Sequence, residues 1–193
     1  MVSRSLILAY HGCDETLVRK VISGRELLRR SDNKHDWLGN GIYFWEDSYD
    51  RAFQWAIEEF KSGKSTIKKP AVVGAVIDLG HCLNLIDSEG LRIVKEAYTG
   101  YKAICRVWGD PEAQNKGRNF KARFLDCAVF ETLHNIRSAE NKPAFDTVRG
   151  FFIEGDELYP GAGLRDLDHI QICVRNPKRI VGYFLPRRSS GTA

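Results

Sequence analysis

The sequence predicts an α+β fold in which two small antiparallel sheets enclose a cleft. Strand and helix patterns alternate in the first half of the chain, and short strand patterns dominate its last third. The composition, 43% hydrophobic and 28% charged over 193 residues, suits a soluble globular protein with a core of its own. We expect one domain over residues 1–186 and a frayed tail over residues 187–193.

The first half of the chain predicts two strands that are each followed by a helix. The apolar run Ser5–Tyr10 is typical of a strand, and Asp14 can cap a short helix that ends at Gly24. A polar loop, Arg29–Asp36, leads to a second strand and then to a longer helix that continues through about Lys61. The longer helix is expected to face the core with Ala52, Phe53, Ala56, Ile57 and Phe60.

The middle of the chain predicts a loop, a buried strand and two helices. Lys61–Pro70 is rich in lysine and is interpreted as a solvated loop, whereas Val72–Leu79 is nearly continuously apolar and predicts a buried strand. Residues 87–103 predict a helix that ends near Gly100, and Asp126–Ser138 predicts another.

The last third predicts three strands, Arg149–Glu154, His169–Arg175 and Ile180–Leu185. The first two are joined by a loop rich in glycine and proline, Gly155–Asp168. Such a loop is expected on the surface, where binding residues concentrate.

Charge and cysteine content narrow the classes of function. The formal net charge of +4 is compatible with nucleic acid binding without requiring it. The five cysteines are dispersed and lack Cys-x-x-Cys spacing, so we expect free thiols in a reducing cytoplasm and no zinc site. No segment approaches the roughly 18 consecutive apolar residues of a membrane span, and no secretory signal is present at the N-terminus. We expect a cytoplasmic protein without membrane contact.

A basic stretch, Lys116–Arg123, contains Phe120 and is followed by Phe124. Aromatic rings among cations are typical of proteins that bind single-stranded nucleic acid. Two phenylalanines four residues apart are equally typical of an amphipathic helix whose rings face the core. We favour the helix, and nucleic acid binding by this stretch stays open as the alternative.

Two glycine-containing segments carry the main functional signal. His11-Gly12 comes at the end of the first strand, and Gly39 and Gly41 directly precede Tyr43. Glycine lets a ligand approach the backbone closely, because no Cβ stands in the way. The glycine backbone can bind an amide, the tyrosine ring can stack on a flat ring, and the imidazole can bind a sugar hydroxyl. Together these groups fit the nicotinamide riboside end of NAD.

These segments, with the small Ala52 on the helix that follows, resemble the ADP-ribosyltransferase superfamily in its poly(ADP-ribose) polymerase and diphtheria-toxin branch. The resemblance covers residues 7–56 and, more faintly, residues 149–184. It implies a split β-sandwich, with two small antiparallel sheets around an NAD cleft and flanking helices. It also implies that NAD is the co-substrate and that no metal is needed.

The resemblance implies that His11, Gly12, Gly41 and Tyr43 bind NAD. A second stacking ring is expected one helical segment later. By an ungapped count it falls at Gln54, and Trp55 beside it can serve with a shift of one residue.

In the family a third strand carries a glutamate that binds the ribose hydroxyl and can deprotonate the acceptor. The alternation of apolar residues places Gln171 at this position, so the implied catalytic set is His11, Tyr43 and Gln171. A glutamine can orient the hydroxyl, but it cannot act as a general base.

Another group would therefore have to deprotonate the acceptor. The candidates are His169, which shares a strand face with Gln171, and Glu154 and Glu157 beside the loop. The alternative that both glutamates are solvated charges stays open. Tyr159 in the loop is expected to contact the acceptor.

These residues indicate an NAD-dependent ADP-ribosyltransferase, a glycosyltransferase that releases nicotinamide. The acceptor would be a macromolecule, with RNA or DNA slightly favoured over protein. A toxin or phage-defence effector, with a neutralising antitoxin protein as partner, is suggested by analogy of fold alone. The alternatives are a catalytically inactive NAD- or nucleotide-binding module of the same fold and a basic RNA-binding protein without NAD.

Overall fold

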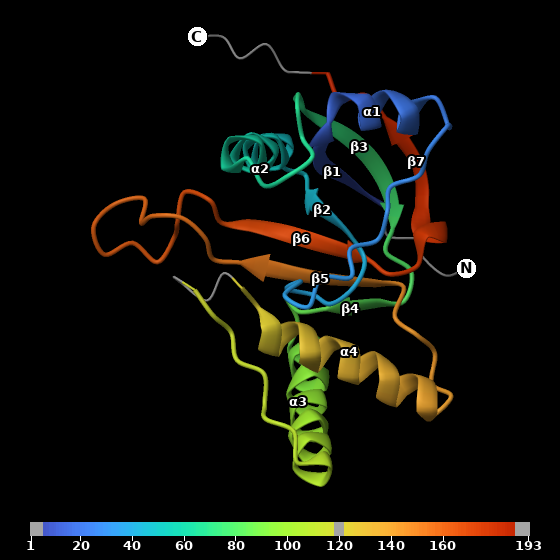
Figure 1. The fold of residues 1–193 in the computed structure, drawn as a ribbon, viewed down its shortest axis with the longest axis vertical. Helices are drawn as coiled ribbons and strands as arrows, with labels where there is room; N and C mark the ends of the chain where they lie inside the picture. The colour runs from blue at the N-terminus through green and yellow to red at the C-terminus, as the bar shows by residue number, and fades with distance from the viewer. Residues whose placement is uncertain (1–5, 118–121, 188–193) are drawn as a thin grey trace.

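The computed structural model describes residues 6–117 and 122–187. Within these ranges the chain is a mixed α/β structure with four α-helices and one seven-stranded sheet (Figure 1). The strands are β1 (Leu6–Asp14), β2 (Ile42–Glu46), β3 (Pro70–Asp78), β4 (Cys82–Asn84), β5 (Thr147–Phe152), β6 (His169–Val174) and β7 (Ile180–Phe184). The helices are α1 (Glu15–Ile22), α2 (Tyr49–Ser62), α3 (Ser88–Trp108) and α4 (Phe124–Ala139).

The expectation of two separate antiparallel sheets is wrong in two respects. The described strands are hydrogen-bonded in one order, β4-β5-β6-β2-β1-β3-β7, and β4 runs parallel to β5. However, β1 pairs with β3 from Leu6 to Asp14 but with β2 only at Ala9 and Tyr10. This short ladder divides the sheet into two halves, β4-β5-β6-β2 and β1-β3-β7. In Figure 1, β4, β5 and β6 run across the view, and β1, β3 and β7 run at an angle to them.

Two differences from the predicted elements have simple causes. Strand β4 has only three residues, which is too short for a period-two pattern to be recognised. Helix α3 continues past Gly100 to Trp108, because Ala97, Tyr101 and Cys105 extend its buried face at a spacing of four. The helix ends where Gly109 adopts a φ of +72°, a conformation that glycine accepts at no steric cost.

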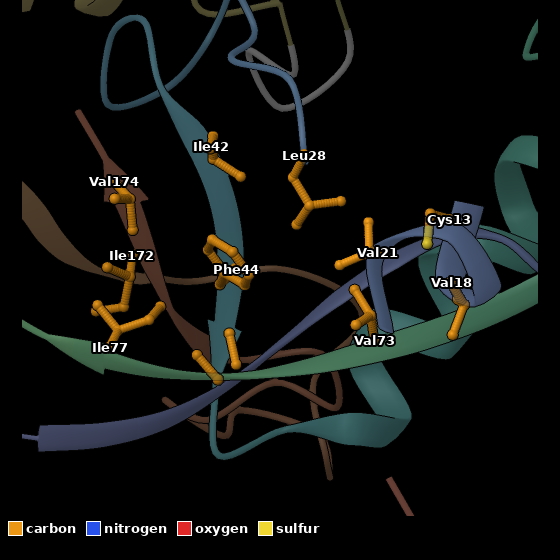
Figure 2. Packing of buried hydrophobic residues seen from close by; sticks show 12 residues of the cluster. Cys13, Val18, Val21, Leu28, Ile42, Phe44, Val73, Ile77, Ile172 and Val174 are labelled. Carbon is orange, nitrogen blue, oxygen red and sulfur yellow. The ribbon is translucent and has the colours of Figure 1, made fainter. Parts of the chain in front are cut away.

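The largest core lies on one face of the sheet and joins both of its halves. Ile42 and Phe44 of β2 face Val73 of β3 and Val21 of α1 there (Figure 2). A second core lies between the β4-β5-β6-β2 half and helices α3 and α4, where Val148, Cys173, Phe130 and Tyr101 are buried. Figure 1 shows α3 and α4 together on this half.

Helix α2 packs on the face of β1 and β3 that α1 does not cover. It approaches β1 so closely that a Cβ on Gly12 would lie 2.2 Å from the backbone oxygen of Ala52. The buried side of α2 differs from the predicted one, since Phe60 is 48% exposed whereas Arg51 is only 7% exposed.

The cysteines are free thiols, as predicted, and four of them are buried: Cys13, Cys105, Cys127 and Cys173. The described residues contain no group of three or more His, Cys, Asp or Glu side chains that could hold a metal ion. No helix in the described part of the chain has both the length and the apolar character needed to span a lipid bilayer.

The predicted helix over Lys116–Arg123 is absent at its described ends. The backbone N–H groups of Lys116 and Ala122 each donate to the carbonyl of the other, at 2.8 and 3.0 Å, which is an antiparallel bridge. Helix α4 begins only at Phe124. Residues 118–121, which include Phe120, lie outside the described residues, as do residues 188–193 of the predicted tail.

The burial of His134 on α4 should make the free energy of unfolding depend on pH. Burial, reinforced by the Arg175 guanidinium, lowers the pKa of His134 to about 4. The unfolded chain takes up a proton at this position near pH 6.5, whereas the folded chain does so only near pH 4. Stability should therefore fall by up to about 3 kcal/mol as the pH drops through this window. Denaturant titrations from pH 7 to 4 should show a smaller fall for His134→Gln, and an equal fall in both proteins would contradict the assignment.

Candidate functional site

A cavity of about 430 Å³ opens where β1 and β2 diverge at the junction of the two sheet halves. Residues from β1, β2, α2, β6, the loop before β2 and the segment that follows β5 line it. The lining side chains and backbone belong to His11, Arg29, Ser31, Asn33, His35, Asp36, Trp37, Gly41, Tyr43, Trp45, Arg51, Trp55, Glu59, Glu154 and Gln171. Its size is that of pockets that hold small molecules.

His11 connects β1 to β2 through its side chain. Its Nδ1 lies 2.7 Å from the backbone oxygen of Tyr43. Since a carbonyl only accepts, Nδ1 carries the proton and donates it. Burial lowers the pKa of His11, which favours the neutral ring. The neutral ring then has an unprotonated Nε2 that can accept a hydrogen bond from a ligand hydroxyl.

Tyr43 lines the cavity, and its hydroxyl is hydrogen-bonded to the backbone of the turn before β2. The hydroxyl donates to the carbonyl of Gly39 at 2.6 Å and accepts from the N–H of Leu38 at 2.9 Å. Burial raises the pKa of Tyr43 well above its usual value. The tyrosine therefore holds the turn before β2 in place and offers a flat apolar surface, and it is not suited to proton transfer.

Gln171 belongs to the same surface as Tyr43. It lies opposite Trp45 in the antiparallel pairing of β6 with β2. Tyr43 and Trp45 are two residues apart on one strand, so all three side chains leave the sheet on the same face. The three residues line one cavity.

A buried ion pair at the cavity joins α2 to Glu154, two residues after the end of β5. Arg51 Nη2 donates to Glu154 Oε2 at 2.8 Å. The Arg51 side chain is 7% exposed and the Glu154 side chain 15% exposed. Arg51 also lies over the ring of Trp45, with its guanidinium carbon 5.8 Å from the ring centroid.

Several buried donors at the cavity have no hydrogen-bond partner among the described residues. They are Nε and Nη1 of Arg51 and Nε1 of Trp45. Arg51 Nη1 comes no closer than 4.0 Å to Glu58 Oε1, which is too far for a hydrogen bond. Unpaired buried donors are costly and rare. These buried donors belong to two residues that also line the cavity.

Two of the three candidate bases lie away from the cavity lining. His169 is buried, donates through Nδ1 to the carbonyl of Leu167 at 2.7 Å and stacks on Phe152. Its Nδ1 lies 3.9 Å from Glu154 Oε2, and burial lowers its pKa. Glu157 lies out in the loop, where its Oε2 accepts from the N–H of Gly161. Of the three, the cavity lining includes only Glu154.

The remaining predicted site residues are divided between the cavity, the packing of α2 and the surface. Trp55 lines the cavity with its ring centroid 5.5 Å from that of Trp45, whereas Gln54 points to solvent. Gly12 is absent from the lining, and the space above its Cα is filled by α2. Its missing side chain thus serves helix packing, and only its backbone could meet a ligand. Tyr159 is 63% exposed in the loop after β5.

Comparison with known proteins identifies a relative of this chain. It is 32% identical to the uncharacterized protein MJ0359 of Methanocaldococcus jannaschii over 197 residues, which cover 93% of this chain and 87% of the archaeal one. The chain belongs to the family of MJ0359. No family model matches it, and no solved structure gives a significant match. Because MJ0359 is itself uncharacterized, the chemistry of the cavity in this family has to be argued from its residues.

Sequence reasoning missed two groups of cavity residues in this MJ0359 relative. Arg51 was not among the α2 residues that were expected to face the core, yet it is only 7% exposed and lines the cavity. The loop before β2 contributes Asp36, the last residue of the segment that was interpreted as a polar connection, and Trp37, which follows it. Burial raises the pKa of Asp36, a shift that is frequent among functional carboxyl groups.

Proposed function

We propose that the protein is an NAD-dependent ADP-ribosyltransferase, which breaks the bond between nicotinamide and ribose and transfers ADP-ribose to a macromolecule. The observation that supports this most is that His11, Tyr43 and Gln171, drawn from three separate strands, line one cavity. Gly41 and Trp55, expected at the same ligand, line it too. We also propose that the sheet, with its two halves and the cavity at their junction, is the split β-sandwich of that superfamily.

The residues present fit the nicotinamide riboside end of NAD. The rings of Tyr43 and Trp55 offer apolar faces, and His11 Nε2 can accept from a ribose hydroxyl. When bound, NAD supplies the ADP-ribosyl group and a leaving nicotinamide.

In the superfamily that the sequence resembles, one glutamate both binds the ribose hydroxyl and supplies a carboxylate. Here Gln171 would have the first role and Glu154 the second. The Gln171 amide oxygen can accept from a ribose hydroxyl and so orient the sugar. Glu154 places a carboxylate in the same cavity, where it can stabilise positive charge that develops on the ribose and receive a proton from the acceptor. Arg51 positions this carboxylate through the 2.8 Å hydrogen bond.

The same ion pair also supports a second candidate function. A carboxylate that is neutralised by Arg51 has a weaker field toward a developing cation than a free one. A non-catalytic NAD-binding module would bind NAD in this cavity and release no nicotinamide. Measuring nicotinamide release together with NAD binding separates the two functions.

Replacing the two strand residues that face the ligand tests the proposed function. We expect His11→Ala with Tyr43→Ala to weaken NAD binding at least about tenfold, or about 1.4 kcal/mol, because a hydrogen bond and a stacking face are lost. Calorimetry with NAD measures binding, and His81→Ala, an exposed histidine outside the cavity lining, serves as the control. If the double variant binds NAD like the parent protein, the cavity is not the NAD site.

A further inference from the structure

One wall of the cavity is a loop without regular secondary structure. Residues 25–41, between α1 and β2, form no helix or strand apart from a bridge that joins Ser31 to Gly41. Asn33 and Trp37 are among the residues of this loop that line the cavity. A connection of this length has no ladder or helix of its own to keep its shape. The shape of the cavity therefore depends on the contacts that hold this loop in place.

The loop ends in the turn Gly39-Asn40-Gly41, which leads into β2. The Tyr43 hydroxyl donates to the Gly39 carbonyl at 2.6 Å, and Gly41 exchanges two backbone hydrogen bonds with Ser31, at 2.8 and 3.1 Å. The first and last residues of the turn are thus bonded to β2 and to the loop itself. The central residue, Asn40, has its backbone partners elsewhere in the chain.

Glu131 of α4 and Arg175, the residue after β6, bond both backbone groups of Asn40. The Asn40 N–H donates to Glu131 Oε1 at 2.8 Å, and the Asn40 carbonyl accepts from Arg175 Nη1 at 2.9 Å. The two side chains are also bonded to each other, with Arg175 Nη1 2.6 Å from Glu131 Oε1 and Nη2 3.3 Å from Oε2. We call this arrangement of Glu131, Arg175 and Asn40 the clamp. It fixes the turn to residues 91 and 135 positions away in the sequence.

The clamp is shielded from solvent and charged. The Arg175 side chain is 13% exposed and the Glu131 side chain 28% exposed. Burial by itself would raise the pKa of Glu131, but the hydrogen bonds from Arg175 and Asn40 outweigh it and lower that pKa. The carboxylate is therefore ionised at neutral pH. Hydrogen bonds to ionised groups are about twice as strong as those between neutral groups, and both bonds of Asn40 are of this stronger kind.

Gly39 makes room for the clamp. It has a φ of +77°, and a Cβ at this position would lie 2.6 Å from Glu131 Oε1 and 3.0 Å from the Cβ of Phe130. Gly39 is not among the described residues that line the cavity. Its missing side chain thus admits the Glu131 carboxylate to the turn and is not needed for contact with a ligand.

We propose that Glu131 and Arg175 are positioning residues for the cavity, although neither side chain is part of its lining. They fix Asn40 from behind, and the turn in turn fixes the Tyr43 hydroxyl through the Gly39 carbonyl. The ring of Tyr43 and the loop wall keep their places only while both charges of the clamp are present. That the ligand is NAD rests on the proposed function, whereas the hold of the clamp on the turn does not.

Amide hydrogen exchange tests the hold on the turn without any ligand. Glu131→Gln keeps the size of the side chain but removes the counter-charge of Arg175. Arg175→Lys keeps the charge but replaces the planar fork, which bonds Asn40 and Glu131 together, with a single ammonium group. We expect exchange in residues 38–41, followed by mass spectrometry, to be at least about tenfold faster in both variants.

The matched controls are Glu46→Gln and Arg149→Lys. They alter an ion pair of similar burial, 16% and 21% exposed, that lies outside the cavity lining. These variants should leave exchange in residues 38–41 unchanged. Equal exchange in the parent protein and in both clamp variants would overturn the proposal.

Ligand binding then tests the effect of the clamp on the cavity. We expect Glu131→Gln and Arg175→Lys to bind NAD about tenfold more weakly by calorimetry. In turnover, KM for NAD should rise while kcat changes little, because Glu154 and Gln171 keep their places. The control variants should bind NAD like the parent protein even where urea titrations show an equal loss of stability, which separates positioning from a general effect on folding.

Two further outcomes separate this inference from the proposed function. Faster exchange of the turn with unchanged NAD affinity would overturn the positioning role. If the parent protein binds no NAD, the proposed function fails, and the exchange measurement alone decides whether the clamp holds the wall of the cavity.

Discussion

Glu154→Gln should reduce nicotinamide release about 100-fold while NAD binding changes little. The variant keeps the size and the hydrogen-bonding capacity of the side chain but removes the negative charge from the cavity. Loss of one preorganised electrostatic contact to a developing charge typically costs about 3 kcal/mol of transition-state stabilisation. Release of nicotinamide under saturating NAD, with calorimetry for binding, measures the two effects separately. Glu112→Gln, which changes an exposed glutamate outside the cavity lining, is the control and should have full activity.

The reciprocal change at Gln171 shows whether the two positions share one role. Gln171→Glu introduces a carboxylate where the superfamily that the sequence resembles has one, so under the proposed function it should raise NAD hydrolysis and leave transfer to the natural acceptor unchanged or lower. In the Glu154→Gln background it should recover much of the lost release, since the charge returns to the same cavity. Gln171→Ala should lose transfer, because the sugar hydroxyl loses its acceptor. Full transferase activity in Gln171→Ala would show that Gln171 is outside the active site.

Gly12→Ala should destabilise the folded protein by about 3 kcal/mol, at the upper end of the cost of overpacking. The added Cβ would lie 2.2 Å from the oxygen and 3.2 Å from the carbon of the Ala52 carbonyl. Both atoms belong to the backbone of α2, so no side-chain rotation relieves the clash. The helix would have to move away from β1, which also displaces Arg51 and Trp55 from the cavity.

Gly182→Ala on β7 is the matched control, because a Cβ there meets nothing within 4 Å. Urea titrations of both variants give the free energies of unfolding. A Gly12→Ala protein as stable as Gly182→Ala would mean that α2 does not approach β1 as the structure has it.

The sequence predicted most of the strands that form the cavity, because their alternation places side chains by a simple rule. The alternation of apolar residues over residues 169–175 assigns the Gln171 side chain to one face of its strand. The pairing of β6 with β2 places that side chain on the same face of the sheet as Tyr43. Arg51 could not be predicted in this way. On a helical pattern an arginine is assigned to solvent, and its burial depends on Glu154, which is 103 residues away in the sequence.

The arrangement of the sheet was harder to predict for a related reason. Strand patterns show that β1 and β2 exist, but they do not show how many residues of each are paired. A ladder of only two residue pairs, at Ala9 and Tyr10, is enough to merge two expected sheets into one. The short strand β4 forms one edge of the sheet and pairs in parallel with β5. The paired residues are more than 60 positions apart in the sequence, so no local pattern predicts this pairing.

The two-pair ladder between β1 and β2 also bears on how a ligand in the cavity would affect the stability of the folded state. A molecule bound between His11 on one half of the sheet and Gln171 on the other adds a connection where the backbone supplies very few. Binding to the native state alone raises the unfolding free energy with ligand concentration, by about 2.7 kcal/mol at a hundred times the dissociation constant. Compounds that bind the folded protein can thus be found by the rise in its melting temperature, before any reaction is known.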